Sequence, residues 1–314
     1  MTAYAATMAA DGAFAIDPRN IDNLVYVNGT LVHRNQATVS VYDAGFMLGD
    51  GVWEGVRLHR GALLFLEDHL DRLFSGAKAI GMALPWSRAN LRAALEQTVR
   101  ANGMAHNVHC RLMITRGPKI TTDQDPRLSL APTIVIIAEH KDETPDERLR
   151  ALKLTTVHIR RGLPETQDPK LNSHSKLNCI MAMLQAMQSG ADEGLMLDAQ
   201  GFVSTCNSVN FFIVRGEEVW TSTGDYCMNG ITRAKTIEVC RAHGLTVRER
   251  NFSLVDVYSA DAAFVTGTTG GQTPVASIDG RVVGDGAIHP AILEIRGWYK
   301  ELVAGYAAAN QMAG

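Results

Sequence analysis

Short apolar runs separated by turn residues fill the first half of the chain and predict strands, hairpins and two helices. Alternating apolar residues flank Asn28 and Gly29, so residues 24–32 are expected to form a β-hairpin around an Asn-Gly turn. One helix is expected from Glu67, which opens an acidic first turn, and another from the N-cap candidate Ser87 to about Ala101. Further strand patterns cover residues 38–41, 52–58, 63–66, 108–115 and 133–138.

The second half mixes strand patterns with helical ones. An apolar, methionine-rich run follows Lys176 and extends to Met187, which predicts a helix. Two more helices are expected, one starting at Ile231 and one starting at about Pro290. Strand patterns cover residues 152–158, 194–197, 211–214 and 262–265. The two halves together predict a mixed α/β (α+β) protein.

A chain of 314 residues is long enough for about two domains. Residues 141–150 are charged and contain one proline, so we expect them to link the domains. This division predicts a flexible tail at 1–23, a small N-terminal α/β domain at 24–140, and a large C-terminal α/β domain at 151–314 that carries Lys176.

Composition and charge narrow the classes of function. The net charge of -3 gives no reason to expect binding to nucleic acid or to an anionic membrane. The alanine-rich start of the chain lacks a basic segment, so we interpret it as a loose tail and not as a signal peptide. The five cysteines are scattered and odd in number, which favours a reducing, cytoplasmic location and argues against a metal site.

The first candidate for chemistry is Lys176, which stands at a predicted helix start among serines and a histidine. A lysine at a packed terminus can be desolvated, and a desolvated lysine loses its proton more easily. A neutral amine can form a Schiff base with an aldehyde, which is the protein's part in pyridoxal-phosphate chemistry. Most lysines are solvated, so Lys176 alone is more often an exposed helix-start residue.

Two other stretches are candidates for binding an anion. Gly230 precedes Ile231 and Thr232 at a helix start, where free backbone N–H groups favour a phosphate. The loop at 266–271 combines small residues, hydroxyls and backbone donors, although many such loops are only turns. With Lys176, these stretches fit pyridoxal 5'-phosphate as a cofactor anchored by its phosphate.

Seven stretches in order resemble the class IV aminotransferases, which are the fold-type IV pyridoxal-phosphate enzymes. Members of this family include branched-chain and D-amino-acid aminotransferases. The resemblance covers roughly residues 24–283 and implies two mixed α/β domains with the cofactor at their interface, usually in a homodimer. The matching stretches lie at 49–57, 68–73, 115–117, 190–193, 210–212, 230–233 and 266–275.

The resemblance also implies roles for single residues. Arg72 matches the arginine that grips the cofactor phosphate, which suits a guanidinium. Ile231 and Thr232 match the helix start that donates N–H groups to the phosphate, and Thr268 matches a phosphate-binding threonine. The residues implied to contact the substrate are Trp53 as an aromatic pocket wall, Thr269 through its backbone, and Arg57 and Arg111 as carboxylate or pocket arginines.

The lysine register departs from the family pattern. Counted back from Glu193, Asn172 occupies the position of the family lysine, and Lys176 falls where many members have a tyrosine. Four residues make one helical turn, so both positions can face one pocket. We therefore assign the catalytic amine to Lys176, with Lys170 as second choice. The competing interpretation is a site that has lost its lysine.

Thr205 is the second departure, because the family usually has a glutamate that pairs with the pyridine nitrogen. A threonine hydroxyl can form a hydrogen bond there, but it carries no charge that would keep the nitrogen protonated. This leaves three hypotheses. The first is an aminotransferase that moves an amino group between a branched-chain-like amino acid, or an amine, and a 2-oxo acid. The second is a lyase or racemase with the same cofactor, and the third is a homologue without pyridoxal phosphate.

Overall fold

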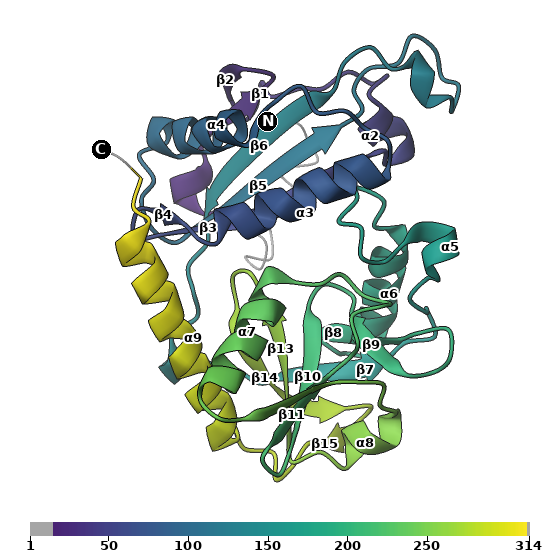
Figure 1. The fold of residues 1–314 in the computed structure, drawn as a ribbon, viewed down its shortest axis with the longest axis vertical. Coiled ribbons are helices and arrows are strands. Elements are labelled where there is room, and N and C mark those ends of the chain that lie inside the picture. The colour runs from purple at the N-terminus through teal and green to yellow at the C-terminus, as the bar shows by residue number, and fades with distance from the viewer. Residues whose placement is uncertain (1–14, 313–314) are drawn as a thin grey trace.

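The computed structural model describes residues 15–312, which form two lobes, each built on a β-sheet (Figure 1). The mixed α/β class predicted from the sequence is confirmed. Most of the predicted flexible tail lies outside the described residues. Its described part contains the short helix η1 (Pro18–Asn20) and is attached to the first sheet, because the side chain of Asn23 donates to the carbonyl of Ala138 at 2.7 Å.

The N-terminal lobe has a six-stranded sheet in the order β2-β1-β6-β5-β3-β4. Asn28 and Gly29 have φ angles of 48° and 95°, which is the left-handed geometry of the predicted hairpin turn. The apolar faces of two helices, α3 (Leu66–Ala79) and α4 (Arg88–Ala101), pack on this sheet and form its core. The strands are β1 (Leu24–Val27), β2 (Thr30–His33), β3 (Gly51–His59), β4 (Ala62–Leu63), β5 (Val108–Thr115) and β6 (Thr133–His140).

The prediction of a strand at residues 38–41 is wrong. This stretch is irregular, and its apolar side chains Val39 and Val41 are exposed because no strand in the described part of the chain pairs with it. A short helix, α2 (Ala44–Leu48), follows instead, with Asp43 as its N-cap and Gly49 as its C-cap. The loop between β5 and β6 contains the short helix η2 (Pro126–Leu128).

The C-terminal lobe has a nine-stranded mixed sheet in the order β12-β11-β10-β13-β14-β7-β8-β9, and β15 pairs with β14. Alternate residues of β10 enter two different cores, because successive side chains in a strand point to opposite faces. The strands are β7 (Leu152–Thr156), β8 (Glu193–Leu197), β9 (Val203–Cys206), β10 (Asn210–Arg215), β11 (Glu218–Thr221), β12 (Thr246–Glu249), β13 (Ala262–Gly267), β14 (Gly271–Ile278) and β15 (Arg281–Val282).

The helices of this lobe include those predicted to start at Ile231 and Pro290. They are α5 (Pro164–Gln167), α6 (Leu177–Gln188), α7 (Ile231–Ala242), α8 (Leu254–Tyr258) and α9 (Pro290–Ala309). None of the helices in residues 15–312 is long and apolar enough to cross a membrane.

Besides the stretch that precedes α6, two connections join the lobes. The first is the segment at 141–151, which runs from β6 to β7 and contains the short helix η3 (Asp146–Arg148). The second is α9, which lies along both lobes in Figure 1. Tyr299 and Val303 of α9 pack in one cluster with Leu64 and Phe65 of the N-terminal lobe. The backbone N–H of Met312 also donates to the carbonyl of Gly61 at 2.9 Å.

Candidate active site

The stretch that leads into Lys176 pairs with the open edge of β3 and so connects the two sheets. Ser173 forms an isolated antiparallel bridge with Val52. The N–H of Trp53 donates to the carbonyl of Asn172, and the N–H of His174 donates to the carbonyl of Gly51, both at 3.0 Å. This pairing holds the beginning of α6 against the N-terminal lobe.

Lys176 is the N-cap residue of α6, as its position at a helix start predicted. Its Nζ lies 5.8 Å from the centre of the Trp53 ring. The pKa of Lys176 is lowered to about 8, mainly by burial and also by the nearby cations Arg161, Arg111 and Arg72, against an opposing effect of Cys179. Lys176 is therefore a desolvated lysine, with a far larger neutral fraction near neutral pH than an exposed lysine has.

The two competing positions have different surroundings. Asn172 is 5% exposed, and its Nδ2 donates to the carbonyl of Trp53 at 2.6 Å. Lys170 is exposed, and its N–H donates to Asp168. Asn172 therefore helps to hold the two lobes together. Lys176, unlike Lys170, is surrounded by buried groups.

Trp53 and Arg111 form a stacked pair beside Lys176. The guanidinium carbon of Arg111 lies 3.8 Å from the centre of the Trp53 ring, and Trp53 Nε1 donates to the carbonyl of Ser173 at 3.1 Å. Burial lowers the pKa of Arg111, and no carboxylate in residues 15–312 opposes that effect. The stack fixes the plane of a guanidinium that can still bind a carboxylate.

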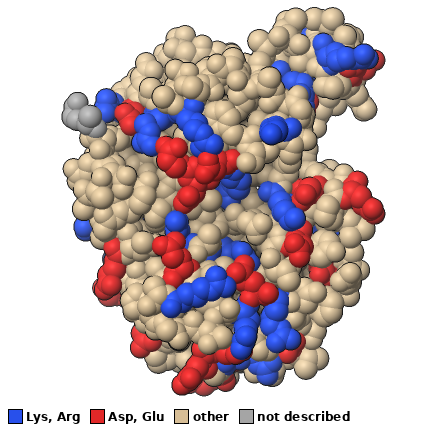
Figure 2. Space-filling model, viewed as in Figure 1, with Lys and Arg blue, Asp and Glu red and all other residues tan. Residues whose placement is uncertain are grey.

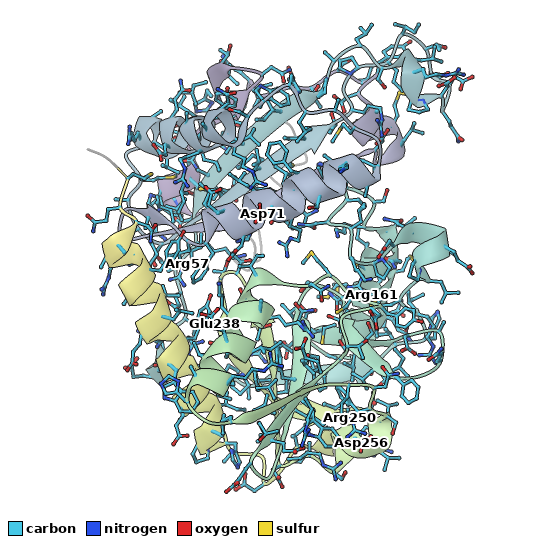
Figure 3. All side chains as sticks on the ribbon, in the orientation of Figure 1. Arg57, Asp71, Arg161, Glu238, Arg250 and Asp256 are labelled. Carbon is cyan, nitrogen blue, oxygen red and sulfur yellow. The ribbon has the colours of Figure 1, made fainter. Side chains whose placement is uncertain are left out.

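Arg57 has different neighbours. It is 6% exposed, and its Nη2 donates to Glu143 Oε2 in the linker at 2.8 Å. Figure 3 shows Arg57 near α9 and Arg161 beside α6, at opposite ends of the junction between the lobes. Arg57 is not among the cations that lower the pKa of Lys176, and its predicted role in substrate binding remains a prediction.

Arg72 lies between the lobes at the start of α7. Its Nε and Nη2 donate to the two carboxylate oxygens of Glu54 at 2.8 and 2.7 Å, and its Nη1 donates to the carbonyl of Asn229 at 2.8 Å. Burial raises the pKa of Glu54, but hydrogen bonds from Arg72 and His69 outweigh burial and keep that pKa below its ordinary value. Glu54 therefore stays ionised and orients Arg72.

The start of α7 can accept an anion. Its N-cap is Gly230, which has no side chain to cap the first N–H groups, including those of Ile231 and Thr232. Thr268 and Thr269 are half-buried in the turn between β13 and β14. This turn is tied to α7 because Gln272 Nε2 donates to Thr236 Oγ1 at 2.8 Å.

Thr205 is buried at the end of β9, with 2% exposure. Its hydroxyl donates to the carbonyl of Val209 at 2.8 Å, and Asn210 Nδ2 lies 3.4 Å from its oxygen. Both of these partners are uncharged, so the hydrogen bonds of Thr205 do not replace the charge of the family glutamate.

Two residues of this region were missed by sequence reasoning. Glu54 orients Arg72, and Arg161 donates from Nη1 to Cys179 Sγ at 3.4 Å. The one available signal for Arg161 was the Arg160-Arg161 pair just before the stretch that contains Lys176. Glu54 is buried in a strand and gave no signal. In Figure 2, basic side chains are visible along the junction of the lobes.

Residues 51–278 match the family described as amino-transferase class IV, and the chain therefore belongs to this family. It is 37% identical over 289 residues to branched-chain-amino-acid aminotransferase-like protein 2 of Arabidopsis thaliana. The aligned region covers 92% of this chain and 52% of that protein. The chain thus spans about half the length of this relative. It is also 33% identical over 279 residues to a putative branched-chain-amino-acid aminotransferase of Methanocaldococcus jannaschii, covering 88% of this chain and 96% of that protein.

Solved structures share the fold. The T.th. branched-chain amino acid aminotransferase with pyridoxamine 5'-phosphate has a TM-score of 0.87 at 27% identity, covering 94% of this chain and 98% of that one. The branched-chain aminotransferase of Thermoproteus uzoniensis with norvaline has a TM-score of 0.82 at 30% identity, covering 90% and 95% of the two chains. These similarities confirm the predicted fold-type IV architecture.

Proposed function

We propose that the chain is a pyridoxal-phosphate-dependent aminotransferase that moves an amino group between an amino acid or amine and a 2-oxo acid. The observation that carries this proposal is the half-buried amine of Lys176, which lies beside Trp53 at the junction of the lobes and has its pKa lowered to about 8. Family membership supports the reaction class. The apolar wall of Trp53 and the branched-chain enzymes among the relatives support a branched-chain-like amino acid as the first substrate to test.

The residues present fit pyridoxal 5'-phosphate. The uncapped start of α7, with Ile231 and Thr232, and the Arg72 side chain would hold its phosphate together with the turn at Thr268. Lys176 would bond to its aldehyde, and Thr205 would lie at its ring nitrogen. When bound, the cofactor supplies an electron sink for the negative charge that develops on the substrate.

The chain's own residues would supply binding and proton transfer. The neutral amine of Lys176 would take the proton from the substrate α-carbon and, for aminotransfer, deliver it to the cofactor's aldehyde carbon, which receives the amino group. Arg111, with its plane fixed by Trp53, would hold the substrate carboxylate, and the backbone of Thr269 would contact the same group. The cations around Lys176 favour its neutral form, which is the form that accepts a proton.

The uncharged hydrogen-bond partners of Thr205 favour a second candidate function, a lyase or racemase with the same cofactor. The Thr205 hydroxyl already donates to Val209 and carries no charge that would hold a proton on the ring nitrogen. A weaker electron sink disfavours aminotransfer relative to reactions that need less charge delocalisation.

We further propose that the protein forms a homodimer and works in the cytoplasm. Exposed apolar side chains support the first proposal. Along α6, Ile180 is 53% exposed and Met187 is 60% exposed, and Phe46 of α2 is 71% exposed. Soluble monomers rarely leave such surfaces uncovered. The five cysteines have unpaired thiols, which supports a reducing compartment.

Borohydride tests the proposed amine, because it converts the reversible bond between the lysine and the cofactor aldehyde into a permanent one. After incubation with pyridoxal phosphate and reduction, peptide mass spectrometry is expected to find the label on Lys176. Lys176→Ala should remove the label, and the matched control Lys170→Ala should retain it. Label on Lys170 would contradict the assignment, and protein that stays colourless and unlabelled would favour the cofactor-free homologue.

The reaction class is decided on the same preparation. Turnover of a branched-chain amino acid that depends on an added 2-oxo acid supports the aminotransferase. Loss of substrate chirality, or release of more than one equivalent of a 2-oxo acid per site without any acceptor, supports the racemase or lyase.

A further inference from the structure

The buried Arg296 of α9 joins the linker to the turn between β13 and β14. It is 2% exposed, and its Nε donates to Asp146 Oδ1 at 2.7 Å. Its Nη2 donates to the carbonyl of Thr144 at 3.1 Å. Its Nη1 donates to the carbonyls of Gly270 and Gln272 at 2.8 and 3.0 Å. A guanidinium presents its donors in a rigid fork, so one side chain fixes the turn relative to the linker.

A chain of hydrogen bonds also links the turn to the start of α7. Gln272 is fully buried, and its Nε2 donates to Thr236 Oγ1 at 2.8 Å. Thr236 Oγ1 in turn donates to the carbonyl of Thr232, the second residue of α7, at 2.7 Å. Gln272 thus binds Arg296 through its backbone and reaches α7 through its side chain.

The backbone beside the turn is shaped to accept this guanidinium. Gly271 has a φ of +58°, and a Cβ at this position would lie 3.3 Å from Arg296 Nη1. The charge of Arg296 is already matched within the linker, where Asp146 binds Nε and Glu143 Oε1 lies 3.9 Å from Nη2. An effect of Arg296 on a phosphate would therefore come from geometry more than from direct attraction.

We propose that Arg296 is a positioning residue that fixes the turn at residues 268–270 relative to the first turn of α7, and thereby sets the affinity for the cofactor phosphate. This inference rests on the proposed function, in which those two elements bind the phosphate. It adds a residue that touches neither cofactor nor substrate, and it connects phosphate binding to the linker between the lobes.

The test compares pyridoxal 5'-phosphate with pyridoxal, which has the same aldehyde and ring but no phosphate. The apparent Kd of each is measured by absorbance titration on the wild type and on Arg296→Lys. Lysine keeps the charge, but it cannot bind both turn carbonyls and the linker together. We expect the affinity for pyridoxal phosphate to fall by about tenfold or more, the scale of a lost charge-assisted hydrogen bond, while the affinity for pyridoxal changes little.

Two further variants make the outcome decisive. Thr236→Val removes only the hydroxyl that relays Gln272 to α7, and it should lower the ratio of the two affinities in the same direction. If Arg296→Lys does not fold, the ratio measured on Thr236→Val tests the proposal in its place. Lys300→Ala is the matched control, because Lys300 binds the other oxygen of Asp146 from the next turn of α9 and does not touch the 268–270 turn. It should leave the ratio unchanged.

Each result has one meaning. Equal weakening of both ligands in Arg296→Lys, or no weakening of either, would overturn the positioning role and leave Arg296 as a structural residue. A wild-type protein that binds pyridoxal phosphate no better than pyridoxal would instead contradict the proposed phosphate site itself.

Discussion

At the scale of single residues, the decisive feature is a lysine whose burial is not offset by a carboxylate in the described part of the chain. Burial and neighbouring cations lower the pKa of Lys176 to about 8 from an ordinary 10.5. The unfolded chain therefore binds more protons than the folded one between these two values, so this group makes stability rise with pH across that window. Below about pH 8 the burial of the charged amine opposes folding in full.

Lys176→Met is therefore expected to stabilise the protein at pH 7. The gain should be on the order of 1–3 kcal/mol, because a pKa shift of one unit corresponds to about 1.4 kcal/mol. Urea unfolding at pH 7 and at pH 10.5 measures it, and the advantage of the variant should shrink at the higher pH as the wild-type amine becomes neutral in both states. A variant that is less stable at pH 7 would show that Lys176 is not strained by burial.

At the scale of elements, the seam between α2, β3 and the start of α6 depends on one glycine. Gly49 has a φ of +69°, and a Cβ on it would lie 2.6 Å from Ser175 Oγ. Ser175 Oγ also donates to the carbonyl of Gly49 at 3.3 Å. A side chain at this position would both strain the backbone and push the Lys176 segment away from the N-terminal lobe.

Gly49→Ala is expected to destabilise the protein by more than the matched change Gly190→Ala. Gly190 has the same φ of +69°, but a Cβ there would meet nothing within 4 Å among the described residues. The control therefore reports backbone strain alone, about 1 kcal/mol. Gly49→Ala should also raise the pH midpoint of borohydride labelling toward that of a solvated lysine. Equal effects of both substitutions would mean that the seam tolerates the extra atom.

The sequence predicted the start of a helix correctly where the residues at that start determine it. Ser87 caps α4 through a capping box with Asn90, and Ile231 begins α7, as the sequence indicated. The failure at residues 38–41 has a physical reason, because alternation predicts a strand only where a neighbour exists to pair with it.

The candidate site was less predictable because it is made by contacts between distant segments. Asn172 meets Trp53 across more than a hundred residues, and this pairing holds the segment that contains Lys176 against the N-terminal lobe. The sequence register placed Lys176 at a helix start, but it could not reveal burial. The partner of Arg57 was equally hidden, because Glu143 stands in a segment that looked like a solvated linker.

At the scale of the whole molecule, the exposed apolar stripe on α6 is the surface that the proposed dimer would cover. Leu177 is 70% exposed and Leu184 is 45% exposed, and helical spacing places them with Ile180 and Met187 on one side of α6. The stripe begins beside α2, because Ser175 binds the carbonyl of Gly49 just after that helix ends. Both apolar surfaces therefore lie at the same junction.

Ile180→Glu combined with Leu184→Glu is expected to convert the dimer into a monomer. Charges placed in an apolar interface lose hydration that the partner cannot replace. Light scattering after size exclusion measures the mass, and Asn178→Asp, which adds a charge on the other, exposed side of the same helix, should leave the dimer intact. A wild-type protein that elutes as a monomer would contradict the proposed assembly.

The route of α9 along both lobes has a mechanical consequence. Two lobes joined only by a linker could rotate apart about it. Here the packing of α9 on Leu64 and Phe65, and the pairing of residues 172–174 with β3, also hold the lobes together. To separate widely, the lobes would have to break these contacts as well as bend the linker. Substrate and product are therefore expected to enter and leave through small movements of the loops around the junction, while the two lobes move together as one rigid body.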